Sequence, residues 1–201
     1  MNVIATIQAD EATPFLKRAL AELQDRGTLN LYVGRSVRNV TRDYLGEQAK
    51  GRHKTAQALG ATPTGHLERA AESVDFEAVP TGAVVSIASP GIARAFGNLN
   101  IKPGAGKKYL TIPATAEAYG RRAAEFNDLK FVSLKGGAVK ALAKIENDDG
   151  GQRTLRVFYW LVKEVNVPAD RTLLPSDALL LDAAEEGARD FIADLITATT
   201  Q

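Results

Sequence analysis

The stretch from Gly97 to Pro113, GNLNIKPGAGKKYLTIP, constrains the fold of this chain more than any other. Its apolar residues predict two short strands, Leu99–Ile101 and Tyr109–Ile112. Pro103 removes a backbone donor between them, and the two glycines that follow permit positive φ, so neither strand can run through. We therefore expect a hairpin with a projecting tip that is rich in glycine and lysine.

Alternating and β-branched residues elsewhere predict further strands. They cover Val74–Ala78, Ala83–Ala88, Phe131–Leu134, Lys140–Ile145 and Arg153–Val165. Ala83–Ala88 is apolar on both faces near its centre, which is typical of a strand inside a sheet. Asn147–Gly151 is a strong turn signal before the longest strand. In that strand Phe158 and Trp160 are two residues apart, so we expect both to pack on one buried face.

Apolar residues at helical spacing predict the remaining elements. Helices are expected from Pro14 to Gly27, from about Gly34 to Leu59, over His66–Ser73, over Thr115–Glu125 and, as an amphipathic helix, over Asp177–Ile196. The predicted class is α+β. It has a mainly antiparallel sheet of about five to six strands flanked by helices, long N-terminal helices and the C-terminal amphipathic helix. We expect residues 1–60 to form an N-terminal helical arm and residues 61–201 to form the main domain.

The residues needed for common catalytic, metal or cofactor sites are not found in recognisable patterns. The chain has no cysteine, which excludes disulfides and thiolate chemistry. His53 and His66 match no metal motif. Lys102–Lys108 lacks the glycine spacing and the hydroxyl residue of a phosphate-binding loop. We expect no enzymatic activity, no metal and no cofactor. No run reaches about 18 apolar residues, so no membrane partner is expected.

Charge is distributed unevenly along the chain, although the formal net charge is only +1. The predicted second helix is basic, and the C-terminal helix is acidic. Such asymmetry favours complementary contacts within or between copies. Arg35, Arg38, Arg42 and Lys50 are candidate contacts to DNA in a channel. The alternative is a solvated helix face, because no aromatic residues alternate with these cations to stack on bases.

Three stretches resemble one family when they are taken together. PTGHLERAAES (63–73) leads into SPGIAR (89–94), NLNIKP (98–103) leads into KYLTIP (108–113), and LLP (173–175) opens the last helix. These stretches are similar to the virion morphogenesis, tail-completion and head–tail joining proteins of tailed bacteriophages, in particular the Mu-like group. The resemblance covers about Thr62 to Leu195 and includes no catalytic residue.

The resemblance implies a structural role at the phage neck, between head connector and tail. The chain would act in the virion, after assembly in the host cytoplasm, as part of a ring that we expect to be a hexamer. Its implied partners are its own copies, neighbouring neck, connector and tail-tube proteins, and passing genomic DNA. Lys102, Lys107, Lys108 and Tyr109 are the candidate assembly contacts. The alternative function is a nucleic-acid- or ligand-binding α+β module, monomeric or oligomeric, unrelated to virions.

Overall fold

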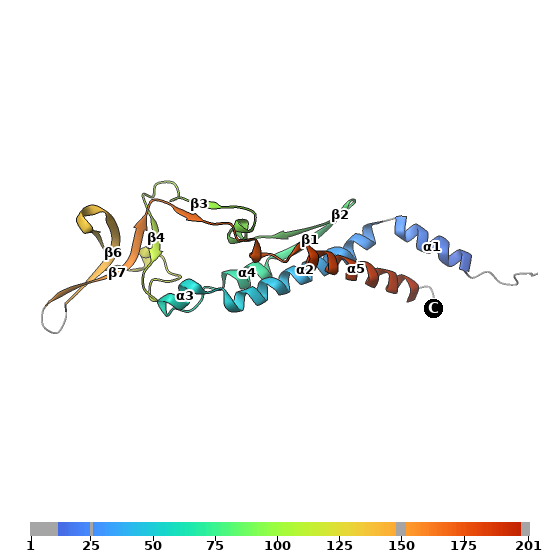
Figure 1. The fold of residues 1–201 in the computed structure, drawn as a ribbon, viewed down its shortest axis with the longest axis horizontal. Coiled ribbons are helices and arrows are strands. Elements are labelled where there is room, and N and C mark those ends of the chain that lie inside the picture. The colour runs from blue at the N-terminus through green and yellow to red at the C-terminus, as the bar shows by residue number, and fades with distance from the viewer. Residues whose placement is uncertain (1–11, 25, 148–151, 198–201) are drawn as a thin grey trace, which may run out of the picture. The chain divides into compact units, whose positions relative to one another are not determined.

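The computed structural model describes residues 12–24, 26–147 and 152–197. Within these ranges it contains α-helices and antiparallel strands, which confirms the predicted α+β class (Figure 1). The helices are α1 (Ala12–Gln24), α2 (Arg26–Gly51), α3 (Lys54–Leu59), α4 (His66–Glu72) and α5 (Asp177–Thr197). The strands are β1 (Val74–Val79), β2 (Gly82–Ile87), β3 (Leu99–Ile101), β4 (Leu110–Pro113), β5 (Lys130–Leu134), β6 (Val139–Asn147), β7 (Arg153–Val162) and β8 (Val165–Val167).

The described strands form three sheets and not the single sheet of five to six strands that we expected. β1 pairs with β2, β3 pairs with β8, and β4, β7, β6 and β5 form a four-stranded sheet in that order. The expected long strand 153–165 is interrupted after Val162, and Val165, where we expected it to end, begins β8. The predicted turn after Asn147 falls on residues 148–151, which lie outside the described residues.

Both strands of the Gly97–Pro113 stretch are present, but they do not form the expected hairpin. β3 pairs with β8 through Leu99↔Val167, whereas β4 pairs with β7 through Leu110↔Val162. The Gly- and Lys-rich loop between them therefore connects two sheets. The hairpin prediction was wrong because each short strand finds a partner that is distant in sequence, which local turn signals do not reveal.

Two helix predictions are also corrected. The expected helix from about Gly34 to Leu59 begins earlier, at Arg26, and is interrupted at Arg52 and His53, so that α3 forms separately. The expected helix over Thr115–Glu125 is a series of turns with one short 3₁₀ segment, η2 (Ala123–Glu125). Gly120 has φ 77°, and a left-handed residue at that point ends helical hydrogen bonding.

The chain divides into two compact units. The first comprises residues 1–46, 69–89 and 174–201, and the second comprises residues 47–68 and 90–173. The prediction of a helical arm over residues 1–60 stays a prediction.

In the first unit, α2 packs against both α5 and the β1–β2 hairpin (Figure 1). The rings of Tyr32 and Phe191 meet edge to face with their centroids 5.7 Å apart. Asn30 Nδ2 donates a hydrogen bond of 2.8 Å to the Val79 carbonyl. The expected interior position of Ala83–Ala88 was wrong, because this sheet has only two strands and Val84 is 55% exposed.

In the second unit, a β-bulge determines which residues of β7 are buried. Leu142 pairs with Tyr159 and Ala143 pairs with Val157, so Phe158 has no partner on β6. A bulge of this kind turns two successive side chains to the same side. Phe158 and Tyr159 are both buried, with Ala118 beside them. The expectation that Trp160 packs with Phe158 was therefore wrong, and Trp160 is 39% exposed.

Candidate functional site

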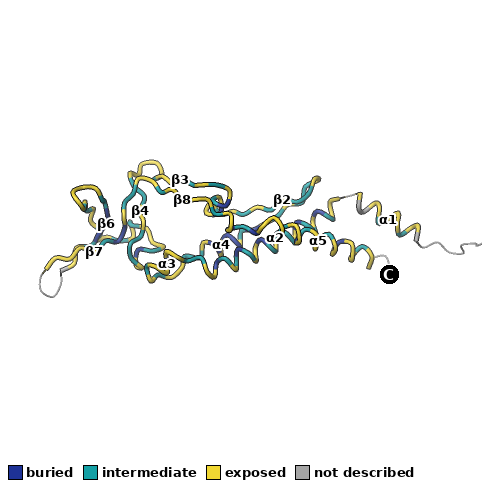
Figure 2. Tube along the Cα trace, in the orientation of Figure 1, coloured by how far each residue is buried: buried dark blue, intermediate teal, exposed yellow. Residues whose placement is uncertain are grey.

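The predicted assembly contacts lie on the loop that connects β3 to β4. Lys102, Lys107 and Lys108 are exposed. Figure 2 shows the loop between β3 and β4 mostly in the colour of exposed residues. The Lys107 amide donates a 3.0 Å hydrogen bond to the Gly104 carbonyl and closes a turn in which Gly106 has φ 77°. This turn needs glycine for its left-handed residue. The loop thus displays three lysine side chains, and a hydrogen bond within its own backbone closes the turn.

Tyr109 anchors the end of this loop. Lys140 on β6 donates a 2.6 Å hydrogen bond to the Tyr109 hydroxyl oxygen, and its ammonium lies 5.0 Å from the ring centroid. This hydrogen bond lowers the pKa of the Tyr109 hydroxyl, and the charges of Lys140, Lys163 and Lys108 act in the same direction. Because Tyr109 is half-buried and bonded to the sheet, it holds Lys107 and Lys108 at a defined place on the surface.

The four predicted DNA contacts lie on α2 but have different surroundings. Arg35 and Arg42 are exposed. The Arg38 guanidinium lies 5.6 Å from the Phe76 ring centroid, and its buried Nε has no hydrogen-bond partner among the residues that the structure describes. Lys50 pairs with Glu47 at 2.5 Å and belongs to the second unit, whereas the other three belong to the first. Arg35 and Arg42 are therefore the best placed of the four to meet a polyanion.

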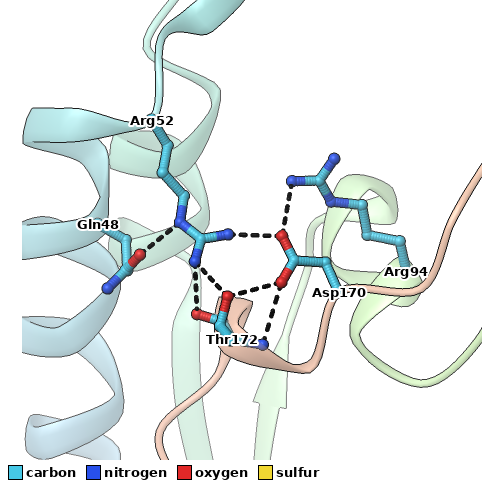
Figure 3. Close-up of polar contacts among 5 residues, drawn as sticks. All are labelled: Gln48, Arg52, Arg94, Asp170 and Thr172. Carbon is cyan, nitrogen blue, oxygen red and sulfur yellow. Dashed lines mark hydrogen bonds and ion pairs between the residues drawn. The ribbon is translucent and has the colours of Figure 1, made fainter.

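A polar cluster centred on Asp170 was not predicted (Figure 3). Arg52 follows the end of α2, and its Nη1 donates a 2.6 Å hydrogen bond to Asp170 Oδ2. Its Nη2 donates to the Thr172 carbonyl at 3.0 Å and to the Thr172 hydroxyl, and its Nε donates to Gln48 Oε1. Arg94, on the 3₁₀ segment η1 (Pro90–Ala95), reaches the same carboxylate oxygen at 3.6 Å.

The carboxylate of Asp170 is held by several donors at once. Thr172 donates to Asp170 Oδ1 from its hydroxyl at 2.6 Å and from its amide at 3.1 Å. The hydrogen bond from the Thr172 hydroxyl, followed by the one from Arg52, lowers the pKa of Asp170. The Asp170 amide also donates to the Arg94 carbonyl at 2.8 Å. The cluster therefore ties the end of α2 to η1 and to the segment after β8, all within the second unit.

A pocket of about 610 Å³ lies against this cluster. Both histidines of the chain line it, together with Arg52, Lys54 and Arg94, so its basic side chains come from three separate segments. Sequence reasoning missed this arrangement because 118 positions separate Arg52 from Asp170. The Asp-Arg-Thr sequence at 170–172 indicates only a local turn, so no spacing pattern identifies its partners.

In the part of the chain that the structure describes, no three His, Asp or Glu side chains gather as a metal site requires. None of the helices in the described ranges combines the length and hydropathy needed to cross a membrane.

Comparison of the chain with protein-family models, with curated proteins and with solved structures gives no match.

Proposed function

We propose that this chain is a structural virion component at the neck of a tailed phage. It forms a ring, expected to be a hexamer, that joins the head connector to the tail, with passing contact to genomic DNA through Arg35 and Arg42. The proposed place in the virion is supported by the resemblance to tail-completion proteins of residues 63–73, 89–94, 98–103, 108–113 and 173–175. The structural observation that best supports a role as a subunit of an assembly is the exposure of many large apolar side chains.

Large apolar side chains are exposed on many described elements, while alanines occupy more than half of the buried apolar positions that the structure describes. Phe96 is 78% exposed, Leu181 on α5 is 59% exposed and Phe131 on β5 is 56% exposed. Single exposed apolar residues are ordinary, but many on successive elements are typical of surfaces that a partner covers. Copies of this chain and its neck neighbours are the partners proposed here.

Charge supports contacts between copies of the chain. The loop presents Lys102, Lys107 and Lys108, all exposed. The exposed carboxylates of α5 are Asp177, Asp182, Glu185, Glu186, Asp190 and Asp194. In a ring made by head-to-tail contacts, a patch on one copy meets a different patch on the next. We propose that the loop lysines of one copy meet the acidic face of α5 on its neighbour.

The test is the double substitution Lys107→Glu, Lys108→Glu in the phage that encodes the chain. The variant should fold, because neither side chain is buried, and its thermal unfolding should match that of the parent protein. Heads and tails should accumulate separately in electron micrographs of the lysate, because the reversed charges repel the acidic α5 face. The matched control is Lys130→Glu, Arg153→Glu, which changes the same charge at exposed positions outside the loop.

Normal infectious particles from the loop variant would contradict the proposed contact. Adding Asp182→Lys, Glu186→Lys on α5 should restore part of the joining if α5 is the partner, since attraction between the surfaces is then re-established. These two acids are four residues apart on the exposed side of the helix, so both can meet one patch.

A further inference from the structure

The pocket beside Asp170 collects basic side chains that are far apart in sequence. Arg52, His53 and Lys54 come from the junction of α2 and α3, His66 begins α4, and Arg94 comes from η1. Tyr119 adds an aromatic wall. All of these residues belong to the second unit. Convergence from separate segments distinguishes this pocket from a basic helix face, where the charges follow one another along a single element.

Positive charge exceeds negative charge on the pocket wall. Arg52, Arg94 and Lys54 are cationic, and Asp170 is the only carboxylate among the residues that line the pocket. The histidines add further positive charge when they are protonated. The Arg52, Arg94 and Asp170 side chains are only 27%, 33% and 30% exposed, so water screens their charges less than it does at an open surface.

The two arginines are bound differently. Arg52 is fixed, because its three nitrogens donate to Gln48, Asp170 and Thr172. Among the described residues, the ion pair of the Arg94 side chain is with Asp170 Oδ2, at 3.6 Å, and Arg52 already holds that oxygen at 2.6 Å. One carboxylate charge is thus shared between two guanidinium groups. Arg94 therefore retains donors and charge that an entering anion can use.

We propose that this pocket binds a small phosphate-bearing anion. Arg94, Lys54 and the two histidines would contact the phosphate oxygens, while Arg52 supplies a fixed positive charge behind them. Guanidinium and ammonium groups are the donors that proteins use most for phosphate. The volume of about 610 Å³ falls in the range typical of small-molecule sites, so the ligand can be larger than inorganic phosphate. The site does not depend on the proposed role in the neck.

The full chain offers a direct readout, because both of its histidines line the pocket. We would titrate inorganic phosphate, a nucleoside monophosphate and a short single-stranded oligonucleotide, in separate experiments at constant pH and ionic strength. The imidazole C–H signals of His53 and His66 should both shift with saturable dependence on the two small phosphates. The indole signal of Trp160, which does not line this pocket, is the internal control.

Arg94→Gln should weaken binding of the monophosphate about tenfold, since it removes a hydrogen bond between charged groups. Lys54→Gln is the second variant. Lys54 is exposed and lies outside the hydrogen-bonded Asp170 cluster, so we expect this variant to fold like the parent protein. Lys130→Gln and Arg153→Gln are matched controls outside the pocket and should leave the affinity unchanged. The proposal is overturned if the histidine signals show no saturable shift with the small phosphates. It is also overturned if neither Arg94→Gln nor Lys54→Gln lowers the affinity for the monophosphate. If the histidine signals shift only with the oligonucleotide, the proposal of a small-anion site is wrong and this region is a nucleic-acid-binding surface.

Discussion

At the scale of single residues, the bulge at Phe158 decides how β7 contributes to the core. Phe158 and Tyr159 are 0% and 1% exposed, and the Phe126 ring meets both of them edge to face, at 5.4 and 6.0 Å. The Tyr159 hydroxyl lies within hydrogen-bond distance of the carbonyls of Ala118 and Arg121. Two adjacent aromatic residues thus fill the interior, and Trp160 faces outward.

We predict that Phe158→Ala lowers the free energy of unfolding by about 3–5 kcal/mol, the range for a fully buried aromatic side chain. Trp160→Ala should cost clearly less, because this side chain already contacts solvent in the folded state. Denaturant unfolding of the two variants measures the difference. A larger loss for Trp160→Ala would place the tryptophan, and not the bulge pair, in the core.

Asp170 should make unfolding depend on pH in acid. Its hydrogen bonds with Thr172 and Arg52 lower its pKa in the folded chain, so the carboxylate stabilises the fold above its ordinary pKa of about 3.9. This stabilisation is lost as pH falls below that value toward the pKa of the folded state. Asp170→Asn should therefore be less stable at neutral pH and lose less stability on acidification. Parallel stability curves from about pH 6 to pH 2 would contradict this role.

At the scale of elements, the close approach of α5 to α2 depends on Gly187. A Cβ at this position would lie 2.8 Å from the Tyr32 carbonyl oxygen and 3.0 Å from Ser36 Oγ. The contact is completed by the 2.6 Å hydrogen bond from the Tyr32 hydroxyl to Asp194 and by the Tyr32–Phe191 ring pair. The two helices can meet along this face only because position 187 has no side chain.

Gly187→Ala should lower the stability of the first unit by about 1–3 kcal/mol, because the helices must move apart to accept the methyl group. Gly46→Ala on α2 is the matched control. A Cβ there meets nothing within 4 Å, and alanine in a helix is more favourable than glycine by about 0.5–1 kcal/mol. The melting temperature should thus fall for the first variant and rise for the second. Equal shifts in the same direction would refute the close packing of α5 on α2.

Elements with strong local signals were predictable from the sequence. A serine directly before a run of helical spacing is a common helix cap, and the Ser176 hydroxyl accepts a 3.3 Å hydrogen bond from the Leu179 amide at the start of α5. β1 follows from the alternation of Val74, Phe76 and Ala78 with acidic residues.

The pairing of β3 with β8 and the Arg52–Asp170 contact were not predictable, because both join residues more than sixty positions apart. The bulge at Phe158 was missed because the prediction placed side chains on alternate faces of the strand, which holds only where the strand pairing is uninterrupted.

At the scale of the whole molecule, the two units contribute different surfaces to the proposed assembly. The first unit presents the acidic residues of α5 and exposed apolar residues such as Leu181 and Ile192. The second presents the lysine loop and the exposed Phe96 and Phe131. Surfaces of opposite charge that also carry apolar residues are suited to contacts between successive copies, which close into a ring when the rotation between copies allows it.

The mass of the full chain in solution tests this account most directly, because each copy contributes 21.5 kDa. Sedimentation velocity over a range of protein concentrations and at moderate salt should detect a closed species of about six copies, as expected of a ring. The Lys107→Glu, Lys108→Glu variant should shift this species toward the single chain, and the Lys130→Glu, Arg153→Glu control should retain it. A single 21.5 kDa species at every concentration, for the parent protein as well as the variants, would contradict the account.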